Sequence, residues 1–133
     1  MITLFIVKSN SPEADRRQTV DSICPYLTDI SVIEDVRSLD EINLFYKKTD
    51  WYMILYDNEE CETRLAVALQ TFIKDGRYDV LTLFKVESPP PDLKMSQSPR
   101  VFKSHITLAD GSMQPEYDDY SVCAVQNGWI TDL

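Results

Sequence analysis

The stretch from residue 50 to residue 69 reads Asp-Trp-Tyr-Met-Ile-Leu-Tyr-Asp-Asn-Glu-Glu-Cys-Glu-Thr-Arg-Leu-Ala-Val-Ala-Leu. Its first part, Trp51 to Tyr56, is an uninterrupted apolar and aromatic run, which is typical of a strand covered on both faces. The carboxylates of Asp57, Glu59 and Glu60 follow at the carboxyl end of this strand, where an open α/β sheet binds its ligands. The pattern predicts a central strand with an acidic rim suited to a divalent cation.

The same three carboxylates have a second interpretation that needs no metal. Acidic side chains in the first turn of a helix interact favourably with its macrodipole, by several tenths of a kcal/mol each. The residues that follow do have helical spacing, and Gly76 stands where a C-terminal cap is expected. The sequence leaves both a metal site and a solvated helix start open.

Strand-like and helix-like segments alternate over residues 1 to 86. This alternation predicts a three-layer α/β fold, with a mainly parallel open sheet, helices on both faces and C-terminal β additions. Four strands are expected in this part, at residues 2–7, 30–36, 51–56 and 80–86. Helices are expected from Ser11 to about Pro25, from Ser38 to Tyr46, and up to Gly76. Two further strands are expected at residues 100–108 and 120–125.

Length and composition indicate a single compact domain over residues 1–133. Residues 87–99 contain four of the seven prolines, which predicts a loop with extended character and no helix. Such a loop serves either as a stiff spacer or as a place for a partner or for chemistry.

The charge and the apolar content exclude several classes of function. A net charge of -9 repels phosphate backbones, so we expect no nucleic-acid binding. No apolar stretch approaches the roughly 20 residues of a membrane span. The apolar start at Met1 lacks a basic leader and a cleavage site, so we expect a first strand, not a signal peptide, and a cytoplasmic protein. The three cysteines show no metal or disulfide spacing and are expected to be buried small hydrophobes.

Three segments together resemble a family 2 glycosyltransferase of the GT-A type. They are Ile2-Thr-Leu-Phe-Ile-Val-Lys8, Asp50-Trp-Tyr-Met-Ile-Leu-Tyr-Asp-Asn-Glu-Glu60 and Pro99-Arg-Val-Phe-Lys103. In that family a short strand opens the chain, Asp-Trp and an apolar strand lead into Asp-Ala-Asp-Glu, and Pro-Arg-Leu-Phe-Arg follows later.

The resemblance implies roles for particular residues. Asp57 and Glu59, with Glu60 beside them, match the motif that holds Mn²⁺ or Mg²⁺ against the diphosphate of a nucleotide sugar. Lys8, Asn10 and Asp35 match positions that line the nucleotide crevice. Glu116 is the candidate for the general base of the acceptor half.

The chain also departs from the family pattern. Val36 and Arg37 stand where the family has glycine and serine or threonine, and their side chains obstruct a close approach of the nucleotide to the backbone. Most of the acceptor half is missing. We therefore expect a shortened, non-catalytic GT-A-like domain that works as a binding, structural or assembly module, including as a part of a viral particle, in which case it belongs to the virion. The alternative is a metal-dependent glycosyltransferase completed by another subunit.

Aromatic residues near the C-terminus suggest where a protein partner or a second copy binds. Tyr117 and Tyr120 flank Asp118 and Asp119, and Trp129 follows closer to the chain end. Tyrosine and tryptophan often anchor protein interfaces. Core packing is the competing interpretation. His105, the single histidine, is expected to be structural or exposed, not catalytic.

Overall fold

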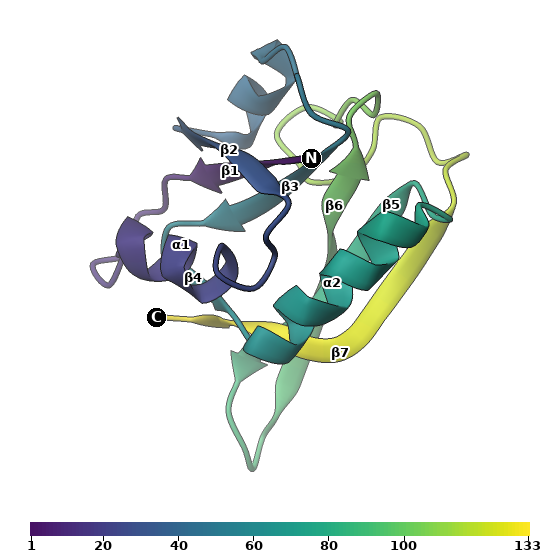
Figure 1. The fold of residues 1–133 in the computed structure, drawn as a ribbon. Helices are drawn as coiled ribbons and strands as arrows, with labels where there is room; N and C mark the ends of the chain where they lie inside the picture. Colours follow the sequence, from purple (N-terminus) through teal and green to yellow (C-terminus); the bar gives the residue numbers. More distant parts are fainter.

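The apolar run Trp51–Tyr56 forms a strand, as its sequence predicts, and lies in the middle of the core. A computed structural model describes residues 1–133, and its elements are shown in Figure 1. The strands are β1 (Ile2–Val7), β2 (Ile30–Val36), β3 (Trp51–Tyr56), β4 (Glu59–Cys61), β5 (Val80–Ser88), β6 (Lys94–Lys103) and β7 (Val122–Asp132). The helices are α1 (Arg16–Ile23), the 3-10 helix η1 (Leu39–Leu44) and α2 (Thr63–Asp75).

All seven strands belong to one mixed sheet, in the order β2-β1-β3-β6-β5-β7-β4. β1 pairs in parallel with β2 and β3, and β5 pairs in parallel with β7. The contacts of β6 with β3 and β5, and of β4 with β7, are antiparallel. Parallel pairing is therefore confined to two separate parts of the sheet.

The sheet is curled into a half-barrel because of the path between β3 and β4. Only Asp57 and Asn58 separate β3 from β4 in the chain. In the order of the sheet, however, β3 is third and β4 is last. Because β4 pairs with β7, the far end of the sheet must bend round until β7 lies close to the carboxyl end of β3. The curl brings side chains of β4, β5, β6 and β7 together in its interior, where they form the polar cluster described below.

The two faces of the sheet are covered differently. Alternate residues of β1 point to opposite faces. Leu4 packs in one cluster with Leu27, which follows α1, and with Leu69 of α2, whereas Phe5 packs in a second cluster with Ile42 of η1. The second face is completed by the irregular segment 104–121, which contributes two buried side chains, Ile106 and Leu108.

The predicted fold class is wrong. Strands make up 41% of the chain and helices 20%, and both α-helices pack against the same core cluster. The three-layer, mainly parallel sheet with helices on both faces is replaced by a curled mixed sheet. The physical reason is that β6 inserts beside β3 in the antiparallel direction, which ends the parallel series after three strands.

The proline-rich segment accounts for much of this difference. The loop predicted over 87–99 is shorter, because Glu87 and Ser88 end β5 and residues 94–99 begin β6. Together β5 and β6 form a long hairpin whose tip projects from the rest of the sheet (Figure 1). Prolines are compatible with this position because the tip and the free outer edge need no ladder hydrogen bond.

Local signals for helices are reproduced with shifted boundaries. The N-cap of α1 is Asp15, whose side chain accepts a hydrogen bond from the Gln18 amide, and not Ser11. The expected helix at Ser38 is the 3-10 helix η1, and Gly76 caps α2 with a positive φ of 67°. None of the helices has both the length and the apolar character needed to cross a membrane.

Candidate functional site

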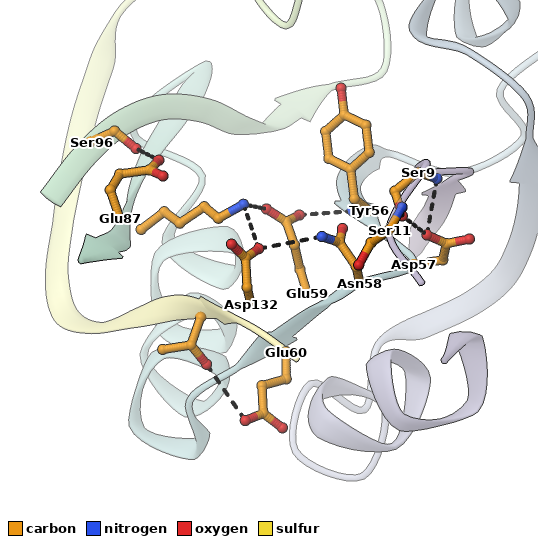
Figure 2. Close-up of polar contacts among 12 residues, drawn as sticks. Ser9, Ser11, Tyr56, Asp57, Asn58, Glu59, Glu60, Glu87, Ser96 and Asp132 are labelled. Carbon is orange, nitrogen blue, oxygen red and sulfur yellow. Dashed lines mark hydrogen bonds and ion pairs between the residues drawn. The ribbon is translucent and has the colours of Figure 1, made fainter. Parts of the chain in front are cut away.

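Glu59 lies inside the curl and is the centre of a buried ion-pair network. Its side chain is 0% exposed. The guanidinium of Arg100 on β6 donates to both carboxylate oxygens, at 2.7 and 2.9 Å. Lys85 on β5 lies 2.7 Å from Oε2 and also pairs with Asp132 on β7 at 2.9 Å. Figure 2 shows Glu59 and Asp132 at this cluster. The Tyr56 amide donates to Oε1 at 2.8 Å, so five strands meet at this cluster.

These contacts fix the charge of Glu59. Burial by itself raises the pKa of this carboxyl, but the hydrogen bonds and charges of Arg100 and Lys85 and the Tyr56 amide lower the pKa to about 2. The pKa of Lys85 is raised in turn, because Glu59 and Asp132 outweigh the effect of its burial. Each oxygen of Glu59 accepts two hydrogen bonds, which uses the acceptor positions that a metal ligand needs.

Asp57 points to a different place from Glu59. Its Oδ1 accepts hydrogen bonds from the amide of Ser9 at 3.0 Å and from the Ser9 hydroxyl at 2.6 Å. Figure 2 shows this contact on the opposite side of Tyr56 from Asp132. Asp57 thus fastens the loop after β1 to the end of β3.

Glu60 faces away from Glu59 because the two residues are neighbours on a strand, where successive side chains alternate. Its carboxylate has long contacts only, at 3.4 Å to Gln18 Nε2 and 3.5 Å to Thr131 Oγ1. The interpretation of Asp57, Glu59 and Glu60 as a helix start is wrong, because Glu59 and Glu60 belong to β4 and pair with β7. No three His, Cys, Asp or Glu side chains of the chain are grouped so that they could hold a metal ion.

The predicted nucleotide-binding residues are partly brought together. Lys8, Asp35 and Asp57 line one cavity of about 330 Å³ at the carboxyl ends of β1, β2 and β3. Arg16 and Arg37 line the same cavity, and Arg16 Nε lies 2.6 Å from Asp35 Oδ1. Asn10 is not among the lining residues. The parallel part of the sheet therefore provides a crevice at the place that the sequence indicates.

The residues predicted for partner binding separate into two groups. Tyr117 and Tyr120 line a cavity of about 330 Å³ beside β5 and β6, together with Pro99 and Pro115. Tyr117 is 63% exposed, whereas Tyr120 packs against the second core cluster. Trp129 is 38% exposed and lines another cavity, near the other end of β7.

The remaining candidates lie outside the crevice formed by the parallel strands. Glu116 is exposed, and its backbone amide donates to the carbonyl of Thr107 at 2.8 Å. It does not line the crevice that contains Lys8 and Asp35. The ring of His105 packs edge-on against Tyr120 at 6.0 Å between centroids.

Sequence reasoning missed the partners of Glu59. Arg100 lies in the segment Pro99–Lys103 that carries the family resemblance, and Lys85 lies in the strand predicted at residues 80–86; neither pattern indicates a partner for Glu59. A signal was present, because Arg100 directly precedes the apolar pair Val101 and Phe102, and a charge in a buried strand requires a counter-charge. Which residue supplies that counter-charge depends on the curl of the sheet, and no local sequence pattern encodes the curl.

Comparison with known proteins yields no family for this chain. No protein-family model matches it, and no curated protein matches it at a significant level.

Proposed function

We propose that this chain is a non-catalytic binding or assembly module that acts through contacts with a protein partner or with a second copy of itself. The observation that carries the proposal is the state of Glu59. The central acid of the sequence motif is buried, and Arg100, Lys85 and the Tyr56 amide use its oxygens. Such a carboxylate ties strands together, whereas a catalytic or metal-binding one needs an open coordination position.

The exposed aromatic side chains support the binding role. Tyr117 and Trp129 both keep a large apolar surface in water and both border cavities. Aromatic residues with this exposure are the ones that interfaces most often use as anchors. Since the two residues lie at different cavities, each is a separate candidate contact.

The test compares aromatic and acidic variants in one binding assay. A partner is identified by chemical crosslinking in cells that make the protein, then purified and titrated calorimetrically. We expect Tyr117→Ala or Trp129→Ala to weaken binding at least about tenfold, as hot-spot truncations do. Asp57→Asn is the control and should leave the affinity unchanged. Normal binding by both aromatic variants, with binding lost in Asp57→Asn, would contradict the proposal.

A self-associating module gives a different readout of the same variants. If the partner is a second copy, light scattering measures a concentration-dependent mass for the unmodified protein. The aromatic variants should then shift the equilibrium towards the monomer, and Asp57→Asn should not.

The crevice at the ends of β1, β2 and β3 favours a second candidate function, the metal-dependent use of a nucleotide sugar with another subunit. Lys8 and Arg37 line this crevice and form no ion pair within the chain. Two such cations suit a diphosphate.

This alternative is tested by thermal shift, since a ligand that binds only the folded state raises the melting temperature. UDP-, GDP- and CMP-linked sugars are added with and without Mn²⁺. A metal-dependent rise that disappears in Asp57→Asn supports the transferase. The same melting temperature with every donor rejects it.

A further inference from the structure

We infer that the cavity beside Trp129 receives an arginine side chain of the protein partner, an inference that rests on the proposed binding function. The cavity has a volume of about 400 Å³ and lies between α1, β4, β7 and the start of α2. Three carboxylates, from Asp21, Glu60 and Glu62, line it together with the aromatic rings of Tyr26 and Trp129. This combination of negative charge and aromatic surface is the chemistry that recognises an organic cation.

The electrostatics of the cavity favour a cation clearly. No lysine or arginine is among its lining residues. The start of α2 contributes the opposite sign, but a helix N-terminus is equivalent to roughly half a positive charge. Glu62 is already paired with Arg64 and Asp21 is loosely paired with Arg17, whereas Glu60 forms no ion pair within the chain. The charge of Glu60 exceeds that of the helix terminus, and the net charge of -9 for the whole chain adds to the attraction.

Two of the carboxylates keep free capacity to accept hydrogen bonds. Glu60 has only its long contacts to Gln18 and Thr131. Asp21 has one ion pair, to Arg17 at 3.8 Å, and both side chains of that pair are mostly exposed. Neither carboxylate is neutralised in the way that Glu59 is.

The rim of the cavity already binds a guanidinium from this chain. Arg64, which does not line the cavity, places Cζ 5.4 Å from the centroid of the Trp129 ring. Its Nε lies 2.5 Å from Oε1 of Glu62. The same two side chains therefore hold one arginine, which is an independent indication of the ligand chemistry that this surface accepts.

Geometry selects arginine over a metal ion or lysine. The acidic side chains are not grouped tightly enough to hold a metal ion. They are spaced around a cavity that also has flat aromatic walls at Tyr26, 41% exposed, and Trp129. A guanidinium is planar, stacks on aromatic faces and donates five hydrogen bonds, whereas a lysine ammonium is a compact, strongly hydrated charge.

The test titrates the intact protein with acetyl-arginine amide and follows the tryptophan indole N–H signals by NMR. Trp51 is buried and serves as an internal reference. We expect a saturable shift of the Trp129 signal alone. Acetyl-citrulline amide, which is neutral and of similar shape, should give no saturable shift, and added salt should weaken the arginine effect.

Variants of the cavity sharpen the result. Glu60→Gln should weaken arginine binding about tenfold, through loss of one charge-assisted hydrogen bond. Asp110→Asn removes the same charge from an exposed turn away from the cavity and is expected to leave binding unchanged. Arg64→Ala frees Trp129 and Glu62 from their internal partner and should tighten binding.

Three outcomes overturn the inference: no saturable shift of Trp129, equal binding of citrulline and arginine, or tighter binding of acetyl-lysine amide than of acetyl-arginine amide. The titration uses no partner protein, so it is decided separately from the proposed function. If the partner requires Tyr117 or Trp129 but arginine fails to bind, the binding module stands and the arginine cavity is rejected.

Discussion

Acidification should remove a defined part of the stability of this protein through Glu59. The pKa of this carboxyl is about 2 in the folded chain, against an ordinary value of 4.5. At about 1.4 kcal/mol per pH unit, this difference corresponds to roughly 3 kcal/mol of unfolding free energy. Because the folded pKa is the lower one, this stabilisation is complete above pH 4.5 and is lost as the pH falls towards 2.

The matched variant is Glu59→Gln, which removes the charge and leaves the shape. At pH 7 we expect it to be less stable by about 3 to 5 kcal/mol, because Arg100 and Lys85 then lack their buried counter-charge. The variant has no titrating group at position 59. The difference between the two stability curves should therefore shrink by roughly 3 kcal/mol between pH 5 and pH 2.

Urea unfolding followed by circular dichroism measures both curves, and Glu60→Gln provides the control. Glu60 is the next residue and points outward, so its substitution should change stability by no more than about 0.5 kcal/mol. A direct check is a carbon-13 NMR titration of the Glu59 carboxyl. A gap between the Glu59→Gln and unmodified curves that stays constant with pH, or a measured pKa near 4.5, would refute the reasoning.

Two further predictions concern packing and cysteine reactivity. Gly128→Ala should destabilise the protein by about 1 to 3 kcal/mol, because Gly128 has a φ of 134° and a Cβ there would lie 3.0 Å from the Leu65 amide nitrogen. Gly111→Ala is the milder control, since Gly111 has a φ of 67° and a Cβ there would have no contact closer than 3.9 Å. Thermal unfolding measures both variants, and the opposite ranking would contradict this account. Burial raises the pKa of the Cys61 thiol to about 12, and it also raises the pKa of the half-buried Cys24 thiol. Alkylation of the native protein at pH 8 should therefore modify Cys123 first and spare Cys61 until urea is added; mass spectrometry measures this order, and early labelling of Cys61 would contradict it.

Local patterns in the sequence predicted the first three strands and the end of α2, but they missed β4 and placed the last two strands at 100–108 and 120–125 where β6 spans Lys94–Lys103 and β7 spans Val122–Asp132. The strands β1 and β3 begin and end where their apolar runs do, and β2 occupies the predicted range 30–36. Gly76 caps α2 because a helix that ends there needs a left-handed residue. The residues Lys8 and Asp35 also line one cavity, since parallel strands bring their carboxyl ends to one edge of the sheet.

The acidic motif shows where local reasoning ended. The composition of residues 57–60 suits a helix start or a metal site, and it does not indicate a strand, because Asp, Asn and Glu are depleted in strands. Pairing of β4 with β7 selected the strand, and alternation then sent Glu59 inward and Glu60 outward. Asp57 lies in the turn before β4, where its carboxylate accepts a hydrogen bond from the Ser9 hydroxyl.

The sequence by itself determined the burial pattern of β1 and β3, the cap at Gly76 and the acidic character of the surface. Only the tertiary structure decided that the sheet curls, that Arg100 and Lys85 neutralise Glu59, and that Tyr26 and Trp129 share a cavity. The physical reason is range. Caps and periodicity act over a few residues, whereas strand order and buried ion pairs join segments more than 20 residues apart, and their energy depends on the whole sheet closing in one register.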